Sequence, residues 1–123
     1  MIKFEVDEPK RLLAIRYRGL VRAEETEKGL EQIRNGLAKL QSGFRLLADL
    51  SELESMDVGC APFIEKAMDM CNEKGASMVV RVIPEPHRDI GLQIMSIFHY
   101  RGDVQIITCQ TLPEADEILR TEA

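Results

Sequence analysis

A seven-residue apolar run near the middle of the chain is the feature that most constrains the fold. Phe44–Leu50 is mostly apolar on both of its alternating faces. Such a segment is typical of a central parallel strand, because helices cover both sides of a parallel sheet. Met78–Ile83 has the same character and stops at Pro84. The two segments predict an α/β fold with a parallel sheet at its centre.

The first twenty residues predict a hairpin that precedes this centre. Ile2–Val6 alternates apolar with polar side chains, which is the period of a half-buried strand. A turn is expected at Glu8–Lys10, since its proline fixes φ and restricts the residue before it. Leu13–Tyr17 then repeats the alternation and ends at Gly19. We expect these two strands to pair with each other.

Two longer segments have the three- and four-residue spacing of amphipathic helices. The first is Arg22–Gln41, for which Gly43 is the expected stop, and the second is Gly59–Lys74, for which Gly75 is the expected stop. Between the central strand and the second helix, the polar segment Ser51–Asp57 is interpreted as a loop. At the carboxyl ends of parallel strands, such loops are where ligands and partners tend to bind.

The last third of the chain predicts two more helices and one more strand. A third helix has Pro86 near its first turn, a strand follows at Val104–Ile107, and Thr111–Glu114 forms a capping box for a fourth helix. The apolar positions of these two helices are Ile90, Ile94, Ile97 and Phe98, and Leu112, Ala115, Ile118 and Leu119. The expected order is β-β-α-β-α-β-α-β-α, a mixed and mostly parallel sheet with about four helices in a single domain, residues 1–123.

Charge and composition exclude several classes of function. A net charge of −5 argues against nucleic-acid binding and against docking on an anionic membrane surface. No apolar run approaches the roughly 20 residues that cross a bilayer, and the first residues lack the layout of a signal peptide, so we expect a cytoplasmic protein. The three cysteines are far apart and the chain has two histidines, which predicts reduced thiols and no zinc site. Since phosphate-binding and catalytic motifs are absent, we expect no cofactor and no enzymatic activity.

The segment Leu47–Asp57 carries a resemblance to a known family. It ends an apolar strand in Asp49-Leu50-Ser51 and places Asp57 eight residues after Asp49. Together with the order of strands and helices, this resembles the STAS family, named for sulphate transporters and anti-sigma-factor antagonists. The resemblance covers essentially the whole chain. It implies a STAS-like fold and a role in bacterial signalling.

The departure from the family pattern lies directly after Asp57. The phosphoacceptor serine of the family would stand there, and this chain has Val58, which has no oxygen to phosphorylate. The resemblance implies a non-catalytic domain that binds a protein partner, such as an anti-sigma-factor kinase, without phosphorylation at the usual site. Its implied partner-binding residues are Asp49, Ser51, Ser55, Asp57, Val58, Gly59 and Cys60. A homodimer is also compatible with a small domain, although no residue specifically supports one.

Each of these residues also has a simpler structural interpretation. Asp57 is expected at least to cap the second helix through its side chain. Ser51 and Ser55 are substitute phosphoacceptors or, more simply, turn residues. Cys60 is a reactive thiolate at a helix start or, as we favour, a small buried hydrophobe. Two other functions therefore stay open: a small-molecule sensor with an apolar cavity, and a thiol-based redox sensor or enzyme centred on Cys60.

Overall fold

The computed structural model describes residues 1–83 and 104–121, which contain five strands, three α-helices and one short 3₁₀ helix. In chain order these are β1 (Ile2–Asp7), β2 (Leu12–Val21), α1 (Ala23–Ala38), β3 (Arg45–Met56), η1 (Val58–Cys60), α2 (Ala61–Lys74), β4 (Met78–Val82), β5 (Gln105–Cys109) and α4 (Leu112–Thr121). The α/β class is confirmed. The third predicted helix, which begins near Pro86, lies outside the described residues.

The strands form one five-stranded sheet in the order β1-β2-β3-β4-β5. β1 pairs with β2 in antiparallel, as the hairpin prediction requires, and Phe4 lies opposite Ile15. All other pairs are parallel, with Leu47 opposite Ala14 of β2 and Val80 of β4. The predicted mixed, mostly parallel sheet is therefore confirmed.

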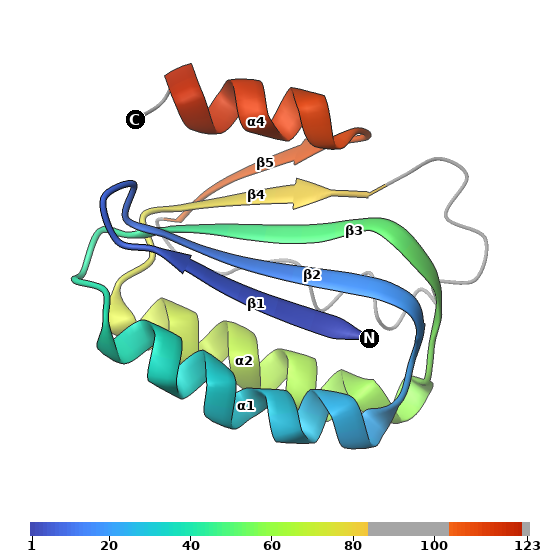
Figure 1. Cartoon of the computed structure of the whole chain (residues 1–123). Coiled ribbons are helices and arrows are strands. Elements are labelled where there is room, and N and C mark those ends of the chain that lie inside the picture. The colour runs from blue at the N-terminus through green and yellow to red at the C-terminus, as the bar shows by residue number, and fades with distance from the viewer. Residues whose placement is uncertain (84–103, 122–123) are drawn as a thin grey trace.

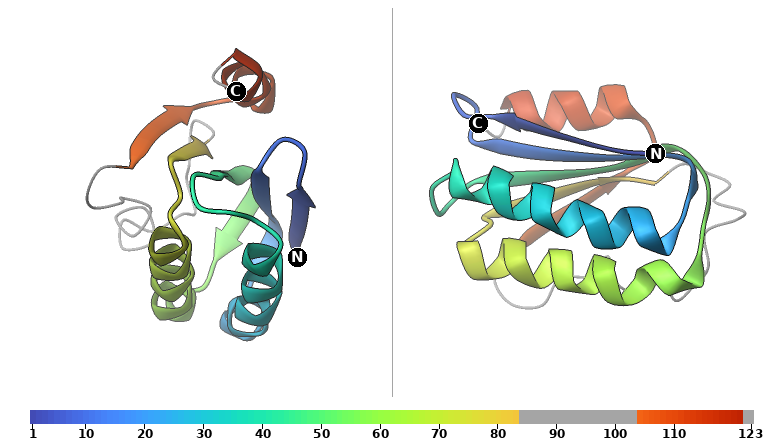
Figure 2. Two further views of the ribbon diagram at one scale, coloured as in Figure 1. Left: turned by 90° about the vertical axis from the view of Figure 1, so that its left-hand side faces the viewer. Right: turned by 60° about the horizontal axis from the view of Figure 1, so that its bottom comes forward.

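Helices cover the two faces of this sheet unequally. α1 and α2 lie side by side against one face, and α4 lies against the other, above β4 and β5 (Figures 1 and 2). Because side chains alternate along a strand, β2 sends Leu13, Ile15 and Tyr17 toward α1 and α2. Its Ala14 packs instead into the smaller cluster beneath α4.

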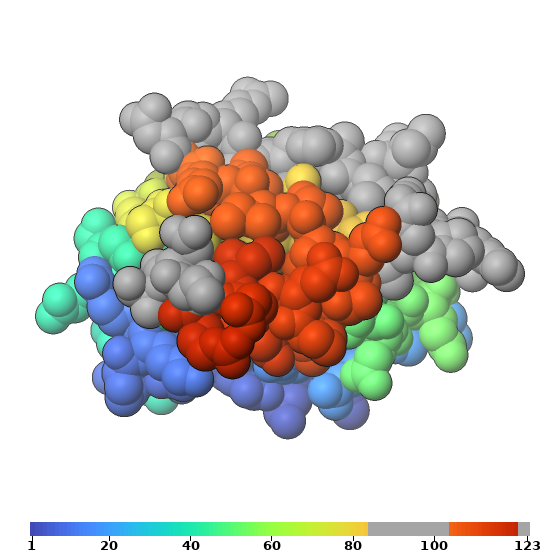
Figure 3. Space-filling view, turned by 90° about the horizontal axis from the view of Figure 1, so that it is seen from above, coloured from blue at the N-terminus to red at the C-terminus, as the bar shows by residue number. Residues whose placement is uncertain are grey.

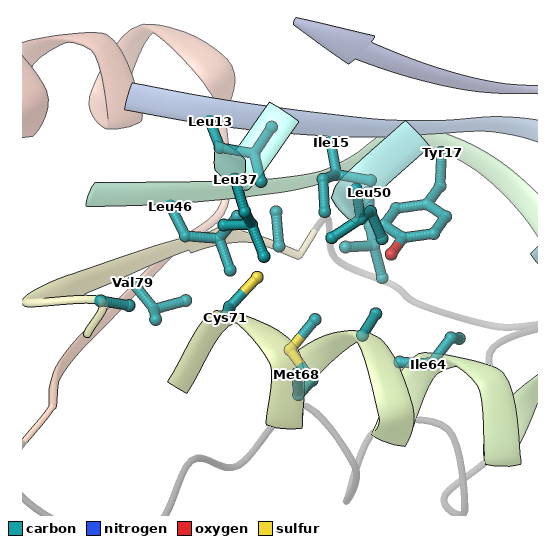
Figure 4. Packing of buried hydrophobic residues seen from close by; sticks show 14 of the residues in the cluster. Leu13, Ile15, Tyr17, Leu37, Leu46, Leu50, Ile64, Met68, Cys71 and Val79 are labelled. Atoms are coloured by element: carbon teal, nitrogen blue, oxygen red, sulfur yellow. The ribbon is translucent and has the colours of Figure 1, made fainter. Parts of the chain in front are cut away.

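The larger of the two cores lies between the sheet and the helix pair α1 and α2. Figure 4 shows Leu37, Ile64, Met68 and Cys71 pointing toward Leu46 and its neighbours on the sheet. Leu13, Ile15, Leu46 and Leu50 are fully buried there. Burying side chains of this size stabilises a fold by about 1.5–3 kcal/mol each, so this layer holds the strand ends in place.

The predicted loop Ser51–Asp57 is wrong over most of its length, because β3 continues to Met56. The continuation pairs with the second half of β2, from Arg18 opposite Glu52 to Val21 opposite Met56. Two register shifts interrupt this pairing, one between Arg16 and Arg18 and one between Gly19 and Leu20. Leu53 and Met56 still face the larger core. The many polar residues around them in the sequence hid this strand pattern.

Helix ends follow the predictions in part. Gly75 ends α2 in the left-handed conformation, with φ of 101°. α1, in contrast, ends at Ala38 and its C-cap is Lys39, because its last turn tightens through bonds to the carbonyls of Gly36 and Leu37. Gly43, with φ of 92°, lies instead in the turn before β3 and donates its N–H to the Gly75 carbonyl at 2.7 Å. The prediction that Gly43 stops the first helix is therefore wrong.

The predicted cap of the last helix by Thr111 is confirmed, although the Glu114 carboxylate reaches back to the Thr111 hydroxyl and not to its backbone N–H. The Glu114 N–H donates to the Thr111 hydroxyl at 3.4 Å, and that hydroxyl donates to the Glu114 carboxylate at 3.0 Å. α4 thus begins at the residue after Thr111. Its buried Ala115 and Leu119 fix the helix against the sheet.

Candidate functional site

The carboxyl ends of β2 and β3 meet the first turns of α1 and η1 at one end of the molecule, on the right in Figure 1. The Asp57 N–H donates to the Val21 carbonyl at 3.0 Å, so the chain leaves β3 beside the point where β2 leads into α1. Gly59 lies against Ala23, since a Cβ at Gly59 would be 3.4 Å from the Ala23 Cβ. The segment from Ser55 to Cys60 therefore lies at this end, with Ser55, Asp57, Val58 and Gly59 at least partly exposed and Cys60 buried.

Asp57 lies at the N-cap position of η1 but does not cap it with its side chain. Its backbone carbonyl accepts the Cys60 N–H at 3.0 Å, which closes the 3₁₀ turn without help from the carboxylate. The predicted side-chain cap is wrong, because a single 3₁₀ turn comes before α2 and its donor is satisfied by the backbone. The exposed carboxylate of Asp57 is left available for other contacts.

Two exposed apolar side chains belong to the same end of the molecule. Val58 is 60% exposed and Leu20 is 59% exposed. Leu20 belongs to the end of β2, opposite Ser55, and Val58 begins η1. Sequence reasoning missed Leu20 because it ended the second strand at Gly19. The available signal in the sequence was the apolar Val21, which continues the alternation of the strand past Gly19 and is buried in the structure.

Acidic side chains gather on the elements that meet at this end of the molecule. Glu24 and Glu25 stand in the first turn of α1, and the exposed Glu52 and Glu54 lie on β3. Arg18 pairs with Glu52 at 2.7 Å, and the amino group of Met1 pairs with Glu25 at 3.4 Å. We call the set Leu20, Glu24, Glu25, Ser55, Asp57, Val58 and Gly59 the acidic end surface. It combines two exposed apolar side chains with three carboxylates, and the exposed Arg22 adjoins it in sequence.

Cys60 lies beneath this surface and is fully buried, which confirms its interpretation as a small hydrophobe. Its Sγ lies 3.6 Å from the Val21 carbonyl, toward which it donates. Burial is the main cause that raises the pKa of the Cys60 thiol. A hydrogen bond with Thr26 lowers this pKa in part, while the nearby carboxylates of Asp57 and Glu25 raise it and a backbone hydrogen bond has the smallest, lowering effect. A protonated, enclosed thiol is poorly suited to attack an electrophile. The position disfavours the thiol-enzyme hypothesis.

Asp49 lies apart from the acidic end surface, within β3 and on the face opposite α1 and α2. Its side chain is only 4% exposed and accepts a hydrogen bond from Arg16 Nη1 at 2.9 Å. The other carboxylate oxygen accepts the Ser51 N–H at 2.9 Å. Arg16 also lies 3.5 Å from Glu5 of β1, so Asp49 is one member of an ion network across three strands. These contacts give Asp49 and Ser51 a structural role.

Within residues 1–83 and 104–121, no group of three or more histidine, cysteine or carboxylate side chains is arranged to hold a metal ion. In the same part of the chain, every helix is too short or too polar to span a bilayer. The carboxylates of the acidic end surface suit contact with cations or N–H donors on a partner.

No family model matches the chain, and no curated protein matches it significantly by sequence. Solved structures do match it in three dimensions. The anti-sigma factor antagonist SpoIIAA in its unphosphorylated form aligns with a TM-score of 0.67 and 14% identity, over 98% of each chain. The phosphorylated form of SpoIIAA, a Bacillus cell fate determinant, aligns with a TM-score of 0.64 and 14% identity, over 98% of this chain and 100% of that one.

A candidate anti-sigma factor antagonist from Thermotoga maritima aligns with a TM-score of 0.62 and 18% identity, over 98% of this chain and 95% of that chain. At these identities the likeness establishes the fold. The alignments extend over nearly the full length of each protein, and the element order and sheet topology are those implied by the sequence resemblance. The chain therefore has the STAS-like α/β fold represented by these anti-sigma factor antagonists.

Proposed function

We propose that this chain is a non-catalytic regulatory domain of the cytoplasm that binds a protein partner through its acidic end surface. The observation that carries the proposal is the exposure of Val58 directly after Asp57, at the position where the resemblance places a phosphoacceptor serine. Exposed apolar side chains such as Val58 and Leu20 are suited to contact, because apolar side chains at the centre of an interface exclude water. The partner would be an anti-sigma-factor kinase or another signalling protein.

Without a hydroxyl at residue 58, phosphorylation there cannot control the binding. In a switch domain, an added phosphate breaks an interface through repulsion and desolvation. Val58 removes that control, so the domain is constitutively competent or responds to another signal. The proposal requires Ser51 and Ser55 to remain unmodified as well.

A pull-down from the native cell tests the binding surface. Wild type and an Asp57→Lys, Val58→Glu double variant are compared as bait. The double variant reverses the charge of residue 57 and replaces the exposed apolar side chain of residue 58 with a charged one. The matched control is Asp69→Lys, which reverses an exposed charge further along α2. We expect wild type and the control to retain one signalling protein that the double variant loses. Equal retention by all three baits would contradict the surface.

Intact mass spectrometry tests the absence of the switch. The protein is incubated with the recovered partner and ATP, and its mass is expected to stay unchanged. A gain of one phosphate that maps to Ser51 or Ser55 would show that the chain has replaced its phosphoacceptor rather than lost it.

The sensor hypothesis has less support in the described part of the chain. An apolar cavity does lie between α1, α2 and the hairpin, lined by residues such as Phe4, Tyr17 and Phe63, but its volume is about 10 Å³. A cavity of that size holds at most about one water molecule. Small-molecule sensing through that cavity would require the core to open, so protein binding is the better-supported function.

A further inference from the structure

A cleft of about 730 Å³ lies at the end of the sheet remote from the acidic end surface. It is formed by the turn between β1 and β2, the residues that lead into β3, and the carboxyl end of α4. Figure 1 shows the hairpin turn and the end of α4 close together on the left, and Figure 3 shows α4 in red beside the blue hairpin. Its charged lining residues are Lys10, Arg11, Arg45, Asp116 and Arg120.

The lining of this cleft is cationic, although the chain as a whole carries a net charge of −5. Arg120 forms an ion pair with Glu117. Lys10, Arg11 and Arg45 form no ion pair with any carboxylate among the described residues. Against them stands Asp116, so the described lining residues carry an excess of two positive charges once the Arg120–Glu117 pair is set aside.

Arg45 is the buried member of this group, with 8% of its surface exposed. Its Nη1 donates to the Leu119 carbonyl at 2.5 Å, near the carboxyl end of α4, and its Nη2 donates to the Lys10 carbonyl at 2.8 Å. A guanidinium has five N–H donors, and carbonyl partners, one of them at the carboxyl end of a helix, offset only part of its charge. Since buried charges are normally paired, an anion in the adjoining cleft would complete the environment of Arg45.

Arg11 is held beside the cleft by the backbone around it. It occupies a left-handed conformation with φ of 53°, and its Nη2 donates to the Ser42 carbonyl at 2.8 Å. Gly43 makes room for this guanidinium, because a Cβ there would lie 2.9 Å from Arg11 Nη2. The side chain is therefore ordered before any ligand arrives, which lowers the entropy cost of binding.

We propose that this cleft binds a phosphate group, either free or on a small organic molecule. Planar arginine forks suit phosphate oxygens, and a lysine adds a mobile point charge. A phosphate carries about −1.5 to −2 charges at neutral pH, which matches the excess of two, whereas a single carboxylate would leave one charge uncompensated. The site is independent of partner binding at the acidic end surface.

Titration of the full chain with inorganic phosphate, followed by NMR at constant ionic strength, tests the proposal. We expect saturable shifts of the Lys10, Arg11 and Arg45 amides. Lys10→Gln and Arg11→Gln are expected to weaken binding about tenfold each, as the loss of one charged hydrogen bond would. Lys66→Gln is the matched control, since Lys66 is an exposed cation on α2, and it should bind as wild type does.

Two further probes identify the ligand class. Glycerol 3-phosphate that binds more tightly than inorganic phosphate would assign the site to an organic phosphate, and the reverse would assign it to the free ion. Succinate that binds as well as either phosphate would overturn the proposal. It would equally be overturned if phosphate gave no saturable shift, or if Lys66→Gln weakened binding as much as Arg11→Gln.

Discussion

The two ends of the sheet are built in opposite ways. At the carboxyl ends of β2 and β3, Leu20 and Val58 are exposed, and the elements that meet there carry several exposed carboxylates. At the other end, Arg45 is buried, and Gly43 and Gly75 adopt left-handed conformations that let neighbouring segments approach closely. The difference indicates that substitutions at the cleft end change stability, whereas substitutions at the acidic end surface change binding and leave stability nearly intact.

A glycine at each end gives the largest expected contrast. Gly75→Ala should lower the free energy of unfolding by about 3 kcal/mol, because the left-handed conformation costs about 1–2 kcal/mol and overlap adds more. The overlap arises because a Cβ at Gly75 would lie within 2.2 Å of Ser42 Oγ. Urea denaturation measures the change. Ser42→Gly in the same background should recover part of it.

Gly59→Ala is the matched control at the other end. A Cβ there meets Ala23 at an ordinary contact distance, and Gly59 is not among the glycines with positive φ. Its effect should stay within about 0.5 kcal/mol. Equal losses from the two substitutions would break the comparison between the ends.

Two aspartates of the implied partner-binding set, Asp49 and Asp57, should likewise differ in how much their substitution changes stability. Asp49→Asn should destabilise the protein by about 2 kcal/mol, because it weakens a largely buried contact with Arg16 and leaves that charge less well paired. Asp57→Asn should leave stability unchanged, since the exposed carboxylate makes no capping bond. Thermal unfolding of both variants, with the pull-down described above, checks the assignment. If Asp57→Asn were the more destabilising change, Asp57 would have a structural role after all.

Alkaline pH should destabilise both cores, since Tyr17 and Cys60 lie in the larger core and Cys109 lies in the smaller one. Burial raises the pKa of Tyr17 and of the Cys60 and Cys109 thiols, so the folded state holds these protons more tightly than the unfolded state. Their contribution is fully present below the unfolded pKa values, about 9 for thiols and about 10 for tyrosine, and is lost as pH rises above them. Urea denaturation from pH 7 to 10.5 measures it, and Tyr17→Phe should flatten the upper part of the curve. A stability that stayed constant over this range would contradict the burial of these groups.

Val58→Ser is expected to have the smallest effect on stability, within about 0.5 kcal/mol, because residue 58 is mostly exposed. The variant restores a hydroxyl at the position implied for phosphorylation. With the recovered kinase and ATP, it should gain one phosphate and lose partner binding. A variant that stays unmodified under these conditions would show that more than one residue separates this chain from a phosphorylated switch.

The fold was largely predictable from the sequence, because periodicity reports burial directly. Ile2–Val6 and Leu13–Tyr17 alternate clearly, and the hairpin they predict is present. Phe44–Leu50 predicted a strand covered on both faces, and Leu46 and Leu47 pack into the two separate cores. Such patterns are local, so they can be recognised in the sequence without knowing which strands pair.

The candidate surface was less predictable, because its features depend on pairing between distant segments. Polar residues in Ser51–Asp57 suggested a loop, and only the register with β2 makes most of them a strand. The prediction that Asp57 caps the second helix was wrong because η1 lies between Asp57 and α2. The cationic cleft gathers Lys10, Arg45 and Arg120 from three separate parts of the chain, which no sequence window brings together.

The two register shifts between β2 and β3 bear on how relatives of this chain can differ in length. From Arg16 to Val21 β2 advances five positions, while β3 advances seven, from Asp49 to Met56. One extra residue reverses which side of a strand faces inward, and a second extra residue restores the original facing. A deletion of a single residue between Ser51 and Ser55 would therefore turn Met56 out of the core and swing η1 to the wrong side. Removing one residue at each of the two shifts would keep Met56 in the core and η1 on its present side. We therefore expect deletions in this strand of related chains to occur in pairs.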